Sequence, residues 1–141
     1  IVIGLLADKT KNTFWIIFGF SIMLFGALIF SLGYISSGMN FIFFLSLLIL
    51  AVGTYSVRAL YFAVLKQANV SLAITGTAVG LISVVGYSPD IFAGPVMGYL
   101  LDTYSGILGH QYVYVMLTVF SFIGLTASLR FAFITKIVPL K

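Results

Sequence analysis

Long apolar stretches, separated by short polar segments, dominate the sequence. The stretch 13–57 contains no charged residue and is long enough for two membrane-spanning helices of about 20 residues each, with a polar break at 36–40 between them. Two further apolar stretches follow. These runs lack the short alternation of barrel strands, and a helix satisfies its own backbone polar groups inside hydrocarbon. We therefore predict an all-α, polytopic integral membrane helix bundle, a single membrane domain over residues 1–141, with spans at about 13–33, 41–64, 72–101 and 112–130.

The composition agrees with a membrane protein and excludes several kinds of site. Of the 141 residues, 62% are hydrophobic and only 7% are charged, whereas a soluble domain carries roughly 25% charged residues. The sequence has no cysteine and a single histidine, His110, so we predict no metal site, no cofactor and no thiol nucleophile. The net charge of +4 comes from basic residues scattered between apolar stretches, which argues against nucleic acid as a partner.

The basic residues indicate how the chain crosses the membrane. With four spans, all of them fall on one side, before the first span, around the end of the second and after the fourth: Lys9, Lys11, Arg58, Lys66, Arg130, Lys136 and Lys141. The two loops on the other side contain neither Lys nor Arg. Because basic residues accumulate in cytoplasmic loops, we predict a multi-pass protein of the cell membrane with a cytoplasmic C-terminus.

The first two spans differ in polarity. Span 13–33 carries aromatic side chains all around the helix, which favours a peripheral, lipid-facing position. In span 41–64, Tyr55, Arg58 and Tyr61 recur at i, i+3 spacing and share one face. An Arg inside a span costs about 2.5–3.5 kcal/mol on insertion scales and usually faces a bundle interior or a cavity. Arg58 also lies about one to two turns from the expected cytoplasmic end, where its side chain can reach the interface. Structural anchoring and a cavity or gating role therefore both stay open.

The third span contains two frames of small residues. They are Gly76-x-x-x-Gly80 near its start and Gly94-Pro95-x-x-Gly98 near its end. Small residues at this spacing let helix backbones approach closely, in a solvent that gives helices no hydrophobic drive to associate. We predict that both frames pack against other helices.

Between these frames lies the polar segment Tyr87-Ser88-Pro89-Asp90. Pro89 removes a backbone donor and predicts a kink. Asp90 is about 27 Å along the helix, beyond the midplane on the outer side, and an ionisable residue there is a candidate for proton relay, ion coordination or substrate contact. Two other interpretations stay open. In the first, Asp90 caps a helix that is broken at Pro89. In the second, it pairs with a basic residue that is missing from this chain, because the one candidate within the chain, Arg58, is distant in the sequence.

The segment 4–12, GLLADKTKN, resembles the G-x-L-A-D-R/K-x-G-R/K cytoplasmic loop of the major facilitator superfamily. The matching positions are Gly4, Leu6, Ala7, Asp8 and Lys9. Lys11 replaces the usual glycine, and Asn12 replaces the usual last basic residue. In the family this loop lies between helices two and three, with a weaker repeat between helices eight and nine. Four spans follow it here, and the third is similar to helix eleven of these transporters, so the resemblance runs from the end of helix eight through helix twelve.

The resemblance implies a twelve-helix secondary transporter that works by alternating access, of which this chain forms part of the C-terminal six-helix half. The helix similar to span 41–64 faces the central cavity, and the one similar to span 72–101 lies at the contact between halves. Gly4, Asp8 and Lys9 then belong to a cytoplasmic gating loop, with a solvated turn as the alternative. The partners implied are a small-molecule solute, the lipid bilayer and the missing N-terminal helices of the same chain.

We therefore expect a permease that moves a small solute by symport, antiport or exchange, coupled to an ion or a proton. An inward-facing Arg58 suits an organic or inorganic anion, and the other candidate contacts are Tyr55, Tyr61, Tyr87, Ser88 and Asp90. The alternative is a small four-helix membrane scaffold or assembly protein without transport activity. An enzyme is not expected, because the spans contain one Asp and no His with which to build a catalytic pair.

Overall fold

The computed structural model describes residues 12–33, 40–60, 62–68 and 70–137, and all regular structure in these ranges is helical. In chain order the helices are α2 (Asn12–Ser31), α3 (Asn40–Leu60), α4 (Ala63–Gln67), α5 (Leu72–Thr103) and α6 (Ile107–Ile137). Of these, 4 are long and apolar enough to cross a membrane, namely α2, α3, α5 and α6. This confirms the predicted fold class, an all-α protein with four candidate membrane spans.

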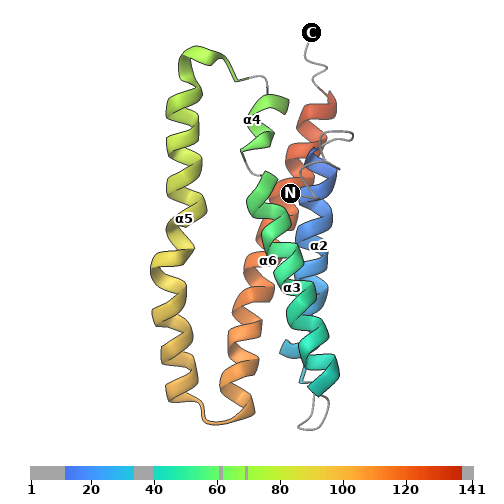
Figure 1. The fold of residues 1–141 in the computed structure, drawn as a ribbon, viewed down its shortest axis with the longest axis vertical. Helices are drawn as coiled ribbons and strands as arrows, with labels where there is room; N and C mark the ends of the chain where they lie inside the picture. The colour runs from blue at the N-terminus through green and yellow to red at the C-terminus, as the bar shows by residue number, and fades with distance from the viewer. Residues whose placement is uncertain (1–11, 34–39, 61, 69, 138–141) are drawn as a thin grey trace.

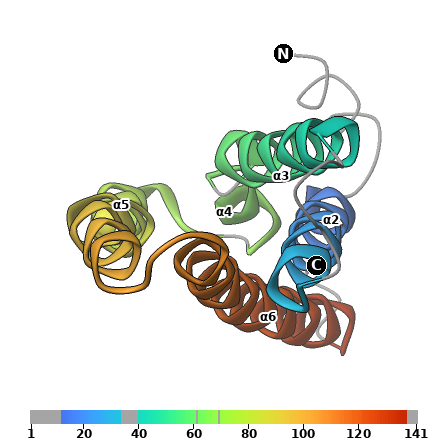
Figure 2. The same cartoon turned by 90° about the horizontal axis from the view of Figure 1, so that it is seen from below.

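The long helices stand side by side, with α2 between α3 and α6 (Figures 1 and 2). The short helix α4 carries the chain from the end of α3 toward the end of the molecule where α5 begins. α5 stands apart from α2 and α3, and it packs against α6. In the most apolar part of α2, 33% of the residues are buried, against 0% in α5. The packed centre therefore consists of α2, α3 and α6.

Small residues allow α2 to lie close to its neighbours. A Cβ atom at Gly19 would lie 2.9 Å from Val57 Cγ2 and 3.2 Å from the Gly53 carbonyl oxygen. A Cβ atom at Gly124, on α6, would overlap the ring of Phe20. At both positions, neighbouring atoms would have to shift to accommodate a side chain. Close backbone approach of this kind is a general basis of helix association in membranes.

Apolar side chains fill the region where α2, α3 and α6 meet. The buried members of this cluster are Ala27, Phe30, Leu50 and Tyr114. The rings of Phe30 and Tyr114 stack with their centroids 4.2 Å apart, and an aromatic pair of this kind contributes about 0.5–1.5 kcal/mol beyond its area burial. A second cluster, nearer the start of α2, contains Ile16 and Leu60. The two clusters fix α2 against its neighbours at two levels.

The position of the first span, expected to be peripheral and lipid-facing, stays a prediction. Phe14, Phe18 and Phe25 are exposed, as that prediction requires. However, Gly19 and Ala27 on other faces of the same helix are buried. α2 therefore exposes phenylalanine side chains on one face and packs small and apolar residues against its neighbours on others.

Two helix boundaries differ from those expected from hydropathy. The second span ends at Leu60, not at residue 64, and the separate helix α4 follows. The fourth span, α6, extends beyond the predicted 112–130 at both ends. Helical hydrogen bonds continue where polar side chains leave the hydrocarbon, and hydropathy does not count those residues as part of a span. The connection between α5 and α6 is therefore a short turn, in which Gly106 has φ 70°, a conformation that favours glycine.

Candidate functional site

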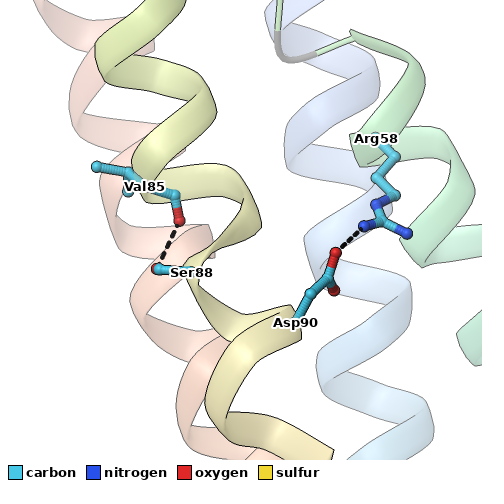
Figure 3. Close-up of polar contacts among 4 residues, drawn as sticks. All are labelled: Arg58, Val85, Ser88 and Asp90. Atoms are coloured by element: carbon cyan, nitrogen blue, oxygen red, sulfur yellow. Dashed lines mark hydrogen bonds and ion pairs between the residues drawn. The ribbon is translucent and has the colours of Figure 1, made fainter.

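Two charged side chains that the sequence singled out meet between α3 and α5. Arg58 Nη2 donates a hydrogen bond to Asp90 Oδ2 over 2.6 Å, which is also an ion pair (Figure 3). Arg58 comes from the last turn of α3, and Asp90 projects toward it from the middle of α5. Asp90 therefore pairs with a residue of this chain. The interpretation that its basic partner is missing from the chain is wrong, because the fold brings the sequence-distant Arg58 beside it.

The ion pair lies at membrane depth. α5 has 32 residues and is about 48 Å long at about 1.5 Å per residue. When such a helix crosses about 30 Å of hydrocarbon, its section from about 18 to about 30 Å from either end is always inside the hydrocarbon. Asp90 is about 27 Å from the start of α5, so it falls in this section together with the guanidinium of Arg58.

This depth corrects the position expected for Arg58. The sequence placed Arg58 close to the cytoplasmic end, from which its side chain reaches the interface. In the structure α3 ends at Leu60 level with the middle of α5, and α4 carries the chain onward to the end of the bundle (Figure 1). The Arg58 side chain reaches across to α5 and contacts a carboxylate there. A charge pair at this depth is expensive to insert and is a candidate functional site by default.

Tyrosine side chains flank the pair on both helices. Arg58 Cζ lies 5.7 Å from the centre of the Tyr87 ring, which is within the range of a cation–π interaction. Tyr87 and Asp90 are one helical turn apart and share a face of α5. Tyr55 shares a face with Arg58 by the same spacing, and its side chain is 70% exposed. Tyr61, the third predicted member of that face, lies outside the described residues.

Ser88 occupies a different position from the other candidates. Its hydroxyl donates to the Val85 carbonyl oxygen over 2.9 Å, on the side of α5 turned away from Asp90 (Figure 3). Pro89 has no N–H to donate to that carbonyl, which is four residues before it, so the Ser88 hydroxyl takes the place of the missing donor. α5 consequently continues as one helix through Pro89. The interpretation of Asp90 as the cap of a broken helix is therefore wrong, while a contact between Ser88 and a solute stays a prediction.

The small-residue frames of α5 are uncovered in the described part of the chain. A Cβ atom at any of the four glycines would meet nothing within 4 Å, namely Gly76, Gly80, Gly94 and Gly98. Pro95 continues the same helix. Their role in helix packing thus stays a prediction, and it concerns a partner beyond the residues described.

Lys66 and Arg130 belong to helices that reach one end of the described bundle. α4, which contains Lys66, and the last turns of α6, which contain Arg130, lie at the same end as the start of α5 (Figure 1). Such a shared basic end is what the positive-inside rule expects of the cytoplasmic side, and the side of the C-terminus stays a prediction. Gly4, Asp8 and Lys9 of the expected gating loop lie outside the described residues.

The arrangement offers anion and proton chemistry. A guanidinium presents five N–H donors in a flat fork that matches a carboxylate or a similar oxyanion. A carboxylate accepts either hydrogen bonds or a proton. Over the described ranges, no group of three or more His, Cys, Asp or Glu side chains could hold a metal ion. The site therefore presents one cation that can bind an oxyanion and one carboxylate that accepts from it.

Sequence reasoning selected both members of the pair but missed their contact. They are 32 positions apart, and the second span was expected to run to residue 64, which placed Arg58 and Asp90 at different depths. One signal was available. Arg58 and Asp90 are opposite charges, each the one charged residue of its predicted span, 41–64 or 72–101, and burying either alone is costly.

Comparisons with known proteins give partial matches. The chain is 35% identical over 74 residues to the inner membrane protein YihN of Escherichia coli strain K12, covering 52% of this chain and 18% of YihN. It is 34% identical over 70 residues to the inner membrane protein YqcE of the same strain, covering 50% of this chain and 16% of YqcE. The matched stretch is thus less than a fifth of either relative. No protein-family model matches the chain, and no solved structure matches it.

Fold, site and comparisons together define a class. The chain is a multi-pass integral membrane protein with four candidate spans and an ion pair between two of them. Over about half of its length it is similar to bacterial inner membrane proteins.

Proposed function

We propose that this chain is part of a secondary transporter of the cell membrane that moves a small solute by alternating access, as in the major facilitator superfamily. The transport is symport, antiport or exchange coupled to an ion or a proton, and an organic or inorganic anion is the solute that suits Arg58. The proposal contains no enzymatic step. In it, further helices of the same protein complete the cavity. The greater length of YihN and YqcE, of which the matches cover 18% and 16%, supports that part of the proposal.

The observation that carries the proposal is the Arg58–Asp90 ion pair at membrane depth. A scaffold needs no charges in its spans, and each charge at the centre of a span costs about 2.5–3.5 kcal/mol on insertion scales. A hydrophobic pair at the same positions would often hold α3 and α5 together at least as well. Two opposite charges at this depth have a functional reason if one of them exchanges its partner during a transport cycle.

Uptake by the complete protein tests this proposal. The complete coding sequence is recovered and expressed, and the purified protein is placed in proteoliposomes with an inward proton gradient. Radiolabelled gluconate, nitrate, phosphate and glucose are then offered. We expect uptake of at least one of these solutes, and a loss of about tenfold or more in Arg58→Gln and Asp90→Asn. Arg130→Gln and Asp102→Asn are the matched controls, since each removes the same charge elsewhere on α6 and α5, and both should keep normal uptake.

Two results would contradict transport through this site. One is the absence of uptake above empty liposomes for every solute, from protein that is monodisperse and folded. The other is unchanged uptake in both Arg58→Gln and Asp90→Asn. Either result would remove the observation on which the proposal depends.

A membrane scaffold or assembly protein is the second candidate function, and α5 is the observation that favours it. Most residues of this helix are apolar, yet none of them is buried in the described chain. An assembly partner could cover it as well as further helices of the same chain. A complete coding sequence with these four spans alone, together with a stable oligomer and no uptake, would favour the scaffold.

A further inference from the structure

The ion pair holds Arg58 with an anion that belongs to the protein itself. The contact joins one guanidinium nitrogen, Nη2, to one carboxylate oxygen, Oδ2 of Asp90, over 2.6 Å. A guanidinium can hold a flat oxyanion through two parallel hydrogen bonds. The Asp90 carboxylate therefore occupies the anion-binding face of the Arg58 guanidinium. The same face can also bind a carboxylate or a nitrate-like ion from solution.

The pair can separate without unpacking the core. α5 packs against α6 and has no buried residue, and the side chains of Arg58 and Asp90 are 47% and 60% exposed in the described chain. Tyr87 lies against the guanidinium, 5.7 Å from its Cζ. The ring can keep Arg58 in place when the carboxylate leaves, because a cation–π contact does not depend on Asp90.

Separation leaves two charges that each need a partner. An unpaired guanidinium or carboxylate at membrane depth is unfavourable. An incoming anion neutralises Arg58. Asp90 is neutralised by a proton from a hydronium ion of the aqueous phase, which adds an O–H bond to one carboxylate oxygen and leaves water. A monovalent anion and one proton then move together, so the bound state carries the same net charge as the empty state.

In the described part of the chain, three titratable groups of α6 have contacts of their own. On α6, the helix packed against α5, the Tyr112 ring lies 4.5 Å from the Tyr104 ring, and His110 Nδ1 is 3.1 Å from the Gly106 carbonyl oxygen. Tyr114 stacks on a ring of α2 at 4.2 Å. Along the bundle axis, Arg130 is about 15 Å from Asp90, toward the end at which α5 begins. Among the described residues, the ion-pair partner of Asp90 is Arg58 on α3, and the Tyr87 ring lies against that guanidinium.

We propose that the solute is a monovalent anion with a planar oxyanion group, either a carboxylate or a nitrate-like ion. This anion displaces Asp90 from Arg58 while Asp90 takes up one proton. This inference rests on the proposed transport function and names its substrate class and its coupling ion. Asp90 is then a competitor of the solute in the unprotonated state and the proton carrier in the loaded state.

Calorimetric titration of the complete protein in detergent tests the exchange. Sodium gluconate and sodium nitrate are the probes, glucose is the neutral comparison, and each titration is repeated in two buffers of different ionisation enthalpy to count protons. We expect about one proton taken up per bound anion, and an affinity that rises about tenfold per unit decrease in pH. Glucose should not bind.

Variants separate exchange from a structural role. Arg58→Gln should bind the anions at least about tenfold more weakly. Asp90→Asn lacks the competitor, so it should bind them more tightly than the wild type at neutral pH, with no proton uptake and no pH dependence. A structural role for Asp90 predicts weaker binding instead. Asp90→Glu should restore the pH dependence. Asp102→Asn and Arg130→Gln should match the wild type.

A double variant keeps the test informative if a lone charge prevents folding. Arg58→Gln combined with Asp90→Asn leaves no unpaired charge, so it should fold and bind no anion. The inference is overturned if neither anion binds the wild type, if Arg58→Gln or the double variant binds as the wild type does, or if Asp90→Asn keeps the wild-type pH dependence. Uptake of glucose with no anion binding would overturn this inference and leave transport standing. Anion binding with proton uptake but no passage into liposomes would overturn the transport function and leave the exchange at Arg58 standing.

Discussion

Gly53 is the position at which the helix packing can be tested with a single methyl group. A Cβ atom there would lie 2.5 Å from Met23 Cγ and 2.9 Å from the Gly19 carbonyl oxygen. The methionine side chain can move aside. The carbonyl oxygen belongs to the backbone of α2, so relief of that contact requires α2 and α3 to separate. We therefore expect Gly53→Ala to destabilise the bundle.

The magnitude follows from two opposing terms. Overpacking a well-packed contact costs about 1–3 kcal/mol, while alanine in place of glycine gains about 0.8–1.0 kcal/mol of helix propensity. Gly80→Ala on α5 is the matched control, because its Cβ meets nothing within 4 Å. It carries the same propensity gain without the overlap. The free energy of unfolding of Gly53→Ala should therefore fall below that of Gly80→Ala by about 1–3 kcal/mol.

Titration of the 141-residue chain with sodium dodecyl sulfate in mild detergent micelles measures this difference. The chain has a single tryptophan, Trp15 on α2, which packs against the buried cluster of Ile16 and Leu60. Its fluorescence therefore reports the separation of α2 from its neighbours. Equal stability of Gly53→Ala and Gly80→Ala would refute the close approach of α2 and α3 at Gly19 and Gly53.

Three further changes can be followed by the same titration. Ser88→Ala should cost about 0.5–1.5 kcal/mol through loss of its bond to the Val85 carbonyl oxygen, and the cost should shrink when Pro89→Ala restores a backbone donor. Gly106→Ala should cost about 1–2 kcal/mol, because φ there is 70° and a Cβ meets nothing within 4 Å, and Gly106→Asn should cost less. Ser121→Ala should raise stability by about 1 kcal/mol or leave it unchanged, since its buried hydroxyl has no hydrogen-bond partner among the residues described. A clear loss there would reveal a bond to a partner.

The sequence predicted the number and type of the spans because crossing hydrocarbon demands a long apolar run whatever the tertiary contacts. It did not predict the close approach at Gly19 and Gly53, which lie on two different helices and meet only after those helices dock. Gly76 and Gly80 have the recognised spacing, but a Cβ atom at either meets nothing within 4 Å among the described residues, so their packing stays a prediction. The spacing of small residues within one helix shows only that one face of that helix is flat. Whether another helix packs on that face depends on the fold.

The residues of the site could be predicted from the sequence, but the contact between them could not. Arg58 and Asp90 stand out as charges in apolar spans, and the desolvation cost alone makes them candidates. Their contact depends on where α3 ends, and hydropathy cannot separate an apolar helix from the apolar segment after it. Once α3 stops at Leu60, Arg58 is level with Asp90 and the ion pair follows.

The value of this ion pair depends on what surrounds it. In water, a pair with side chains exposed by 47% and 60% would contribute only about 0–1 kcal/mol. In hydrocarbon, each charge becomes costly when its partner is removed. The contact is therefore weak while water is present and strong when water is excluded. Entry of water with a solute would loosen the link between α3 and α5, and its exclusion would restore that link. In the proposed transport cycle, this dependence on hydration would link exchange at Arg58 to the position of α5, the long helix that has no buried residue.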